Sequence, residues 1–450
     1  MTPVEIRADE DAKSAVYHAF WRWHFYAGLL VMPILMLMAL TGGLYLFKDE
    51  IDGAIYRRLL VVPAGTAATS PQAWADAAGR ALGGHVVQVV PPAEPVRSAK
   101  LVLETAGGRV AAYVDPHNAR VLGSTPDGGV MQVVKRLHSL DIAGPAFNVL
   151  VEVVAGWAIV MVATGVVLWW PRKQSGGVVT VRGRPGRRVF WRDLHAVAGV
   201  FAGGLIVFLA VTGMPWSAVW GQEVRKLTTD AGWGRPKPPA AAEGWAHAGH
   251  KPMSPGVPWA LQDGDMLTHS MGQALTLDAA VARVDAASLP RPYVLTIPKD
   301  AGKAWTAAYM PDRVEGMRTL YLDGSTGRLL ADIGYGQFGP AAKAIEWGIS
   351  VHQGQQLGWL NKLVMLAGCV AIWLLGLSAL VMWWKRRPSG RLAAPPRPAS
   401  RGAYVALLAV VAPIAVLYPL VGLSLGFVLI LDLVARRAVL ATRPVPEVLS

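Results

Sequence analysis

The segment that most constrains the fold is residues 21–43, which read WRWHFYAGLLVMPILMLMALTGG. A histidine, His24, stands at the start of an apolar run that is long enough to cross a bilayer. A similar pattern recurs downstream, where WRDLH ends at His195 and opens a second apolar run. The two runs share small residues at equal offsets from the histidine: Gly28 and Gly199 at +4, Thr41-Gly42 and Thr212-Gly213 at +17.

A second pair of apolar runs matches in the same way. Each run follows a histidine, carries a glycine six residues later and ends in a double tryptophan 31 residues later. The members are His138, Gly144 and Trp169-Trp170 in one run, and His352, Gly358 and Trp383-Trp384 in the other. The chain therefore reads as a tandem repeat, and parallel repeats of this kind imply a pseudo-twofold axis along the membrane normal.

The composition indicates a membrane protein, because 53% of residues are hydrophobic and only 16% are charged. Four stretches approach or exceed the roughly 20 apolar residues that a span needs. A fifth, residues 403–435, contains two prolines and is expected to form a hairpin of two short helices or one long bent helix. The four long stretches are residues 25–47, 145–170, 196–220 and 357–384.

The net charge of +13 is concentrated in two short segments, residues 171–193 and 385–402. The positive-inside rule puts these segments and the N-terminus in the cytoplasm, with both long loops outside. We therefore expect a multi-pass protein of a bacterial inner membrane, with large periplasmic loops and no nucleic-acid partner. The first apolar run is too long for a signal peptide and is expected to stay as an anchor.

The expected fold is mainly α: a four-helix transmembrane core of two tandem repeats, two outer α+β domains and a C-terminal helical hairpin. Residues 110–123 and 318–331 both read as strand, turn and strand, and each follows an amphipathic segment. The expected parts are 1–47 (N-tail and first span), 48–137 (outer domain), 138–170 (span), 171–194 (basic loop), 195–220 (span), 221–351 (outer domain), 352–384 (span), 385–402 (basic linker), 403–435 (hairpin) and 436–450 (cytoplasmic tail).

The four matched histidines are the candidate metal ligands. A twofold axis brings His24 to His195 and His138 to His352, and two facing imidazoles are what bis-histidine haem iron requires. The only cysteine, Cys369, excludes a CxxCH attachment, so two haem b groups are expected. The glycines and threonines at matched positions are expected to line them: Gly28, Gly199, Thr41, Gly42, Thr212, Gly213, Gly144 and Gly358. The alternative is that duplication has copied interfacial or structural histidines.

Other polar residues leave two readings open. Glu152, inside the second apolar run, is expected to tune the outer haem or pass a proton, or to sit at the interface. A histidine- and methionine-rich stretch of soft ligands suits copper, although a plain Pro/Gly-rich loop explains it equally. That stretch includes His247, His250, Met253, His269 and Met271. Met214 is expected to pack, and His18 and His117 are expected at the surface.

These features together resemble the PepSY-associated transmembrane family of iron-regulated membrane proteins. The resemblance rests on the TrpArg…His…Gly…ThrGly run, the LeuHis…Gly run ending in Trp169-Trp170-Pro171, and the VDP…VLG element within residues 110–123. It covers residues 15–388 and implies that both outer domains are PepSY-like. It further implies a ferric-siderophore reductase, which takes electrons from a cytoplasmic flavoprotein or reduced flavin and passes them to a ferric chelate outside.

Two other classes of function compete with a metalloreductase. PepSY domains also serve as inhibitory modules, so the outer domains would then bind and regulate a partner protein without redox chemistry. A transporter is the second rival, but it normally needs broken helices and polar groups at the midplane. Except for Glu152, the candidate polar residues lie at the ends of the apolar runs.

Overall fold

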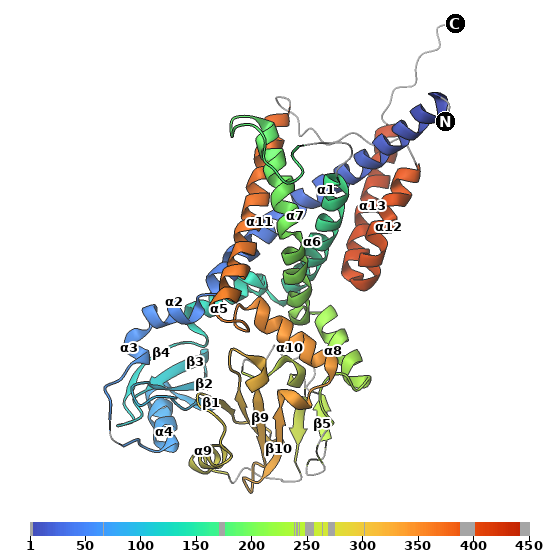
Figure 1. Cartoon of the computed structure of the whole chain (residues 1–450). Helices are drawn as coiled ribbons and strands as arrows, with labels where there is room; N and C mark the ends of the chain where they lie inside the picture. The colour runs from blue at the N-terminus through green and yellow to red at the C-terminus, as the bar shows by residue number, and fades with distance from the viewer. Residues whose placement is uncertain are drawn as a thin grey trace. The chain divides into compact units, whose positions relative to one another are not determined.

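The computed structural model describes residues 3–441 except 66, 171–175, 238, 240–241, 243, 248–255, 263, 269–274, 301 and 388–400. The chain divides into two compact units, each described by itself below (Figure 1). The helical unit comprises Met1–Thr41, Leu137–Gln222 and Leu366–Ser450. The sheet unit comprises Gly42–Arg136 and Glu223–Met365.

Four helices are long and apolar enough to cross a membrane among the residues that the structure describes. They are α1 (Pro3–Tyr45), α6 (Asn148–Trp169), α7 (Arg188–Gly213) and α11 (Trp359–Arg386). These are the four expected spans, but several boundaries differ: α1 begins well before residue 25, and α7 ends at Gly213 and not at residue 220. Helix α6 begins about ten residues after His138, whereas α7 begins seven residues before His195. The expectation for α7 followed the apolar residues alone, while the helix continues through a charged turn in which Arg192 neutralises Asp193.

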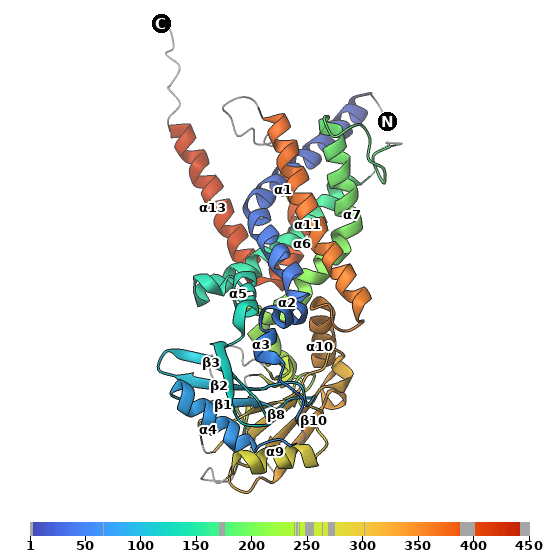
Figure 2. The same cartoon turned by 90° about the vertical axis from the view of Figure 1, so that its left-hand side faces the viewer.

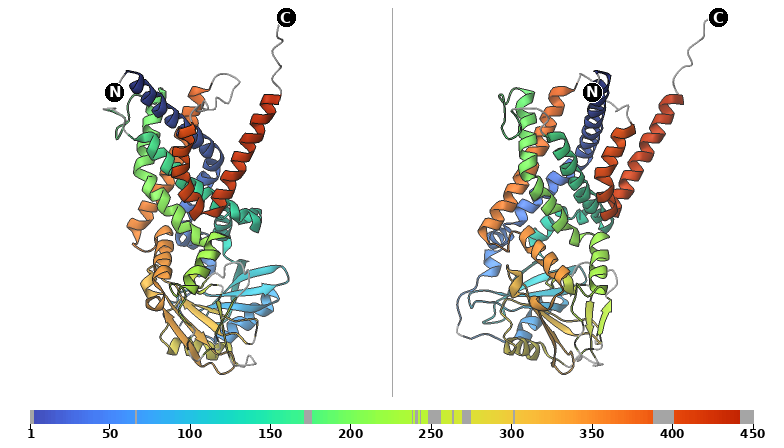
Figure 3. Two further views of the ribbon diagram at one scale, coloured as in Figure 1. Left: turned by 90° about the vertical axis from the view of Figure 1, so that its right-hand side faces the viewer. Right: turned by 45° about the vertical axis from the view of Figure 1, so that its right-hand side comes forward.

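The C-terminal apolar region forms two helices, α12 (Arg401–Leu417) and α13 (Pro419–Ala441), so the hairpin reading is the one observed. The break falls at Tyr418 because a residue before proline is disfavoured in the helical conformation, and Pro419 suits the first turn of the next helix. Both helices pack against α6, and Figure 3 shows α12 and α13 with the other helices of the helical unit.

The sheet unit is built on eight strands in one sheet, in the order β10-β9-β8-β7-β1-β2-β3-β4. All neighbours in this sheet are antiparallel. A separate pair joins β5 (Gly244–His247) to β6 (Gly264–Leu267). The eight strands are β1 (Gly84–Val90), β2 (Ala99–Thr105), β3 (Gly108–Val114), β4 (Val121–Pro126), β7 (Val294–Thr296), β8 (Trp305–Tyr309), β9 (Arg318–Leu322) and β10 (Leu329–Gly334).

The two long segments between spans, 48–137 and 221–351, were expected as separate outer domains, but both contribute strands to one continuous sheet. Strand β1 of the first segment pairs with β7 of the second through Gln88↔Thr296 and Val89↔Leu295. The physical reason is that each four-stranded half would leave an unpaired edge, and mutual pairing satisfies both edges. The expected strand-turn-strand elements are present as β3–β4 and β9–β10.

Helices α4 (Pro71–Leu82) and α9 (Leu277–Ala286) pack on each other and share one apolar core with the sheet (Figure 2). The first turn of each is capped by a hydroxyl: Ser70 Oγ accepts from Ala73 N, and Thr276 Oγ1 accepts from Ala279 N. Their buried faces include Trp74 and Val281, which meet strand residues such as Leu101 and Leu320.

The remaining helices connect these elements and position the candidate histidines. His138 is the last residue of α5, and His352 is the last residue of α10. These connecting helices are α2 (Lys48–Ile55), α3 (Arg57–Leu60), α5 (Gly129–His138), α8 (Trp220–Asp230) and α10 (Pro340–His352), with short 3₁₀ turns at η1 (Asp141–Ala143), η2 (Pro145–Phe147), η3 (Met214–Trp216), η4 (Trp259–Leu261), η5 (Val314–Gly316) and η6 (Tyr335–Gln337).

Candidate functional site

The centre of the candidate site is the pair His24 and His195, on α1 and α7 of the helical unit. Their ring centroids lie 6.3 Å apart, and the ring planes are nearly perpendicular, at 88°. Both side chains are half-buried. The expected convergence of these two histidines, which are 171 positions apart in the chain, is therefore present.

The Nδ1 atoms of both rings are held by the helices packed against them. His24 Nδ1 lies 3.0 Å from Thr164 Oγ1 on α6, and His195 Nδ1 lies 3.0 Å from Ser378 Oγ and 3.1 Å from the Leu375 carbonyl on α11. Thr164 donates its own proton to the Val160 carbonyl at 2.8 Å, so its oxygen is left to accept. A backbone carbonyl, or a hydroxyl that already donates its proton, can only accept a hydrogen bond. Nδ1 of each ring must therefore carry the proton, which leaves the lone pair on Nε2.

Thr164 and Ser378 are functional candidates that were not among the residues predicted from the sequence. Each lies five residues before a double tryptophan, Trp169-Trp170 or Trp383-Trp384, so their spacing matches. In each case the backbone three residues earlier, at Met161 or Leu375, is a second hydrogen-bond partner of the histidine. A shared hydroxyl at this offset was the available signal.

The donor set fits a metal between the two imidazoles. Among the described residues, neither Nε2 has a hydrogen-bond partner. Two metal–nitrogen bonds of roughly 2 Å each, plus two ring radii of roughly 1 Å, separate ring centres by about 6 Å. The 6.3 Å separation agrees with this sum. Gly165 lets α6 approach the site closely, since a Cβ there would lie 3.3 Å from His24 Cε1.

His138 has the same kind of partners within the helical unit. Its Nδ1 lies 2.9 Å from the Met38 carbonyl and 3.1 Å from Thr41 Oγ1, three residues further along α1. Thr41 is 3% exposed and donates to the Leu37 carbonyl at 2.8 Å. Burial lowers the pKa of His138, which favours the neutral ring that binds metals. Thr41 is thus a direct partner of a candidate ligand, as its matched position led us to expect.

His352 ends α10 in the sheet unit, whereas His138 belongs to the helical unit. The expected pairing of these two histidines draws one residue from each unit and stays a prediction. Thr212, at the position matched to Thr41, donates to the Phe208 carbonyl at 2.7 Å.

The matched glycines divide into two kinds. A Cβ at Gly28 or Gly199 would make ordinary contacts, 3.7 Å from Met161 Cε and 3.6 Å from Leu375 Cδ2. Gly144 and Gly358 instead have positive φ angles of 115° and 65° in the turns before α6 and α11, with open space around them. Backbone conformation therefore explains Gly144 and Gly358 without a ligand. Gly42 and Gly213 lie within the last turns of α1 and α7.

Glu152 is completely buried in the first turns of α6. Its Oε2 accepts from Trp220 N at 3.0 Å, at the start of α8, while Oε1 has no hydrogen-bond partner among the described residues. Tyr418, at the turn between α12 and α13, is 2% exposed, and its ring centroid lies 5.7 Å from that of Trp220 with the planes tilted by 38°. The side chain is enclosed by protein, and it lies in the second turn of α6, close to the start of the span.

The remaining candidates make ordinary packing or backbone contacts, or lie outside the described residues. Met214 is 1% exposed within an apolar cluster of the helical unit, as expected for packing. Half-buried His18 bonds to the Ser14 carbonyl at 2.8 Å. His250, Met253, His269 and Met271 lie outside the described residues, and for His247 only the backbone, in β5, is described.

The charged turn before His195 is neutralised locally. Asp193, 1% exposed, accepts from Arg182 Nε at 2.7 Å and from an Arg192 guanidinium nitrogen at 2.8 Å. Two arginines of the basic loop are thus committed to fixing the start of α7.

Comparison with known families now identifies the class. The PepSY-associated TM region matches residues 21–386, which is most of the chain and includes all four matched histidines. The chain belongs to this family of membrane proteins. No curated protein matches the sequence closely enough to refine that statement. Helices α12 and α13 lie beyond the matched residues.

Proposed function

We propose that this protein is a two-haem electron-transfer protein of the inner membrane, which reduces a ferric siderophore or another ferric chelate on the outer face with electrons from a cytoplasmic donor. The observation that carries the proposal is the His24–His195 pair. These imidazoles lie 6.3 Å apart with Nδ1 of both occupied and Nε2 of both without a described partner.

His24 and His195 would hold one haem b, and His138 and His352 the other. Each haem would supply a one-electron iron couple in an apolar site. The chain's own contribution is the orientation of the ligands: Thr164, Ser378 and Thr41 fix the ring tautomers. Hydrogen bonds of this kind to the distal nitrogen raise ligand basicity and hold the ring plane.

Apolar packing between the four spans holds the helices that carry the first pair. Clusters of buried side chains on α1, α6, α7 and α11 include Ala39, Ala158, Ile206 and Leu375. This packing would fix the spacing of α1 and α7, and with it the separation of the two ligands.

The proposed orientation follows the charge distribution, with the basic loops and the N-terminus in the cytoplasm. A flavoprotein or reduced flavin would donate electrons at that face. The acceptor would be a ferric chelate with hard oxygen donors, which holds Fe(II) less tightly than Fe(III) because the reduced ion is softer and carries less charge. Reduction would therefore release the metal.

Optical spectroscopy of the purified protein tests the cofactor. We expect a low-spin Soret band and about two haems per chain by pyridine extraction. His24→Ala and His195→Ala should each remove one haem, whereas His18→Ala, which changes a histidine on the same helix as His24, should remove none. Unchanged loading in both pair variants would overturn the ligand assignment.

Reconstituted vesicles test the activity separately. Reduced flavin enclosed on the face of the basic loops should drive ferrous iron formation from a ferric chelate on the other face, detected with a ferrous-specific dye. The chelate's ligand should stay outside, which separates reduction from transport. A colourless protein that binds a partner would instead favour the regulatory PepSY module, and reduction confined to cupric chelates would favour a copper reductase.

A further inference from the structure

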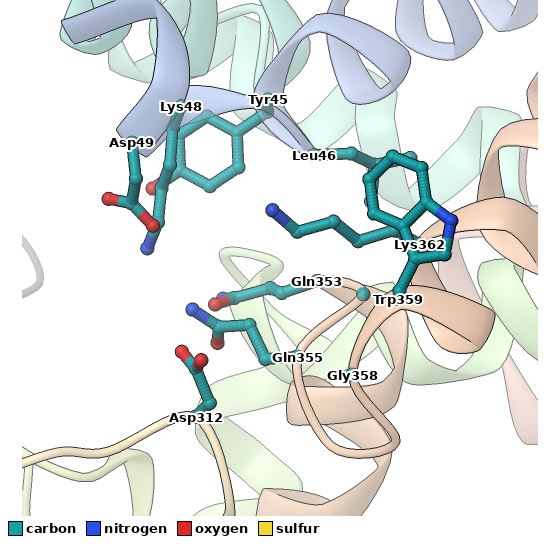
Figure 4. Close-up of a pocket in the computed structure, with 11 residues that line it drawn as sticks. Tyr45, Leu46, Lys48, Asp49, Asp312, Gln353, Gln355, Gly358, Trp359 and Lys362 are labelled. Carbon is teal, nitrogen blue, oxygen red and sulfur yellow. The ribbon is translucent and has the colours of Figure 1, made fainter. Parts of the chain in front are cut away.

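The sheet unit contains a pocket of about 210 Å³ whose lining comes from three separate chain segments (Figure 4). The first segment is the end of α1 and the start of α2, with Tyr45, Lys48 and Asp49. The second is the loop from α10 into the start of α11, with Gln355 and Lys362. Asp312, which precedes η5, closes the third side.

The pocket's size limits its occupant to about one substituted six-membered ring. A cavity of about 150 Å³ holds benzene, whereas drug-sized ligands need about 300–1,000 Å³. A volume of 210 Å³ falls between these values. A whole ferric chelate is therefore too large, but a single ring with small polar substituents fits.

The lining offers both aromatic surface and charge of both signs. Tyr45 and Trp359 supply rings, and Lys48 Nζ stands 5.6 Å from the Tyr45 ring centroid. Figure 4 shows the Lys362 amine and the Asp312 carboxylate directed toward the space between the segments. Ammonium groups donate to an oxygen, and carboxylates accept from a hydroxyl. A ring that carries hydroxyls can satisfy both groups at once.

Other small ligands match this lining less well. A phosphate or sulfate would meet the carboxylates of Asp49 and Asp312 as well as the two lysines, so like charges would oppose its binding. A hydrocarbon ring would bury charged groups without giving them hydrogen bonds, which costs free energy. A neutral ring with two hydroxyls avoids both penalties.

The loop that closes the pocket depends on a glycine and an ion pair. Gly354 has a φ of +74°, and a Cβ there would lie 2.8 Å from Leu46 Cδ2 and 3.2 Å from Lys362 Cγ. Lys362 Nζ also pairs with Glu50 at 2.7 Å, and this partner holds the pKa of Glu50 below its ordinary value. The ammonium of Lys362 is thereby fixed at the pocket, directly beyond the loop that begins after His352.

We propose that this pocket binds a dihydroxylated aromatic ring. Two sources carry that chemistry: the head group of a membrane quinol, and a catechol arm of a ferric chelate. Tyr45 and Trp359 are the terminal residues of two spans, so a lipid-borne head group has a route to the site. As an electron partner the ring depends on the proposed function, but its binding is measurable without electron transfer.

Calorimetric titration of the full-length protein, reduced and kept free of oxygen, tests the pocket with catechol and hydroquinone. 1,4-Dimethoxybenzene serves as the control ring, because it cannot donate to a carboxylate. Lys362→Met should weaken binding of the dihydroxylated rings about tenfold, the loss of one charge-assisted hydrogen bond. Glu50→Gln keeps the ammonium but releases it from the ion pair that fixes it, so the affinity should fall by a smaller factor than in Lys362→Met.

A second variant keeps the test decisive if Lys362→Met folds poorly. Trp359→Leu should weaken binding severalfold, whereas Trp347→Leu, an exposed tryptophan away from the pocket, should not. Equal affinity for the dimethoxy ring, or equal losses in Lys362→Met and Glu50→Gln, would overturn the proposal. Competition by a long-chain quinol in nanodiscs identifies the lipid source, and competition by a ferric catecholate identifies the chelate. Haem content is scored independently, so either hypothesis can fail without the other.

Discussion

The two spans that end in a double tryptophan, α6 and α11, are alike on one face and different on another. Toward the histidines they are alike, since Thr164 and Ser378 occupy matched positions and each holds a ring nitrogen. The difference is on the face that α6 turns to the C-terminal hairpin. In the most apolar part of each helix, 50% of residues are buried in α6 and 33% in α11, because α12 and α13 also pack against α6.

The residues on the hairpin-facing side of α6 have no counterparts in α11. Gly156 lies under Val421, and Trp157 donates from Nε1 to Ser424 Oγ at 2.9 Å. By spacing from the preceding histidine, the α11 residues at these positions are Val370, which is 60% exposed, and Ala371. The comparison teaches that the hydroxyl positions that contact the histidines match in the two helices, whereas the α6 positions that contact the hairpin do not match those of α11.

The largest expected effect breaks the contact between α6 and the hairpin. Gly156→Leu should destabilise the protein by about 3 kcal/mol, because a Cβ at Gly156 already falls 2.2 Å from Val421 Cγ2 and the core must be overpacked. Val370→Leu at the matched position of α11 should shift stability by less than about 0.5 kcal/mol. Thermal unfolding in one detergent measures both. Equal shifts in the two variants would contradict the asymmetry between the spans.

The helices that precede the two spans should differ in their response to pH. Glu346 of α10 is 1% exposed and bonds to Ala260 N at 2.9 Å, and burial raises its pKa from 4.5 to about 7. Gln132 of α5, also six residues before its histidine, is exposed. A raised carboxyl pKa means that the folded state binds the proton more tightly. Stability is thus lost as pH rises from 4.5 through 7, by up to about 3 kcal/mol.

Urea unfolding of the protein at pH 5 and pH 8 measures the contribution of Glu346 to the free energy of unfolding. Glu346→Gln should reduce the loss of stability between the two pH values, while Gln132→Glu on the exposed surface of α5 should add little. An unchanged pH dependence in Glu346→Gln would show that Glu346 does not carry the effect.

Because Thr164 of α6 and Ser378 of α11 hold the two histidines in the same way, removal of either hydroxyl should weaken haem retention equally. Thr164→Val and Ser378→Ala should each weaken haem retention about tenfold, the lower end of the range for partners of metal-bound histidines. Transfer of haem to an apoprotein trap measures the rate of loss. Thr228→Val is the matched control, because Thr228 Oγ1 donates only to the Val224 and Arg225 carbonyls of its own helix. Retention unchanged in both variants would limit the hydroxyls to a packing role.

The smallest effect concerns the hydrogen bond between Trp157 and Ser424. Trp157→Phe and Ser424→Ala should each cost about 1 kcal/mol, and the double variant little more than one of them, because both remove the same bond. Additive losses in this cycle would show that the bond itself does not hold the hairpin.

The spans, the strand-turn-strand elements and the His24–His195 pair could be predicted from sequence, because each leaves a local pattern of apolar residues or a repeated spacing. The sequence does not show that Thr164 and Ser378 are the hydrogen-bond partners of His24 and His195. Which hydroxyl meets which ring depends on the rotation of one helix against another, and the apolar pattern around α6 is nearly uniform. The contact between Gly156 and the C-terminal hairpin could not be predicted for the same reason.

The pairing of β1 with β7 escaped prediction for a different reason. The two strands lie more than 200 positions apart and exchange only two residue pairs, so no local periodicity reports them. Glu152 illustrates a related limit: its depth in the protein depends on Trp220 and on Tyr418, which comes from a segment outside the matched family region.

The order of the large sheet reads the same outward from the β1–β7 pair: first strand, second, third and fourth on either side. When two equivalent strands pair antiparallel, a twofold rotation exchanges one strand with the other. A self-complementary interface between two identical subunits has the same symmetry. A polypeptide holding only the first half would thus present, at β1, an edge able to join a second copy of itself. Two separate short chains could build this sheet, and fusion into one chain then frees each copy to change alone.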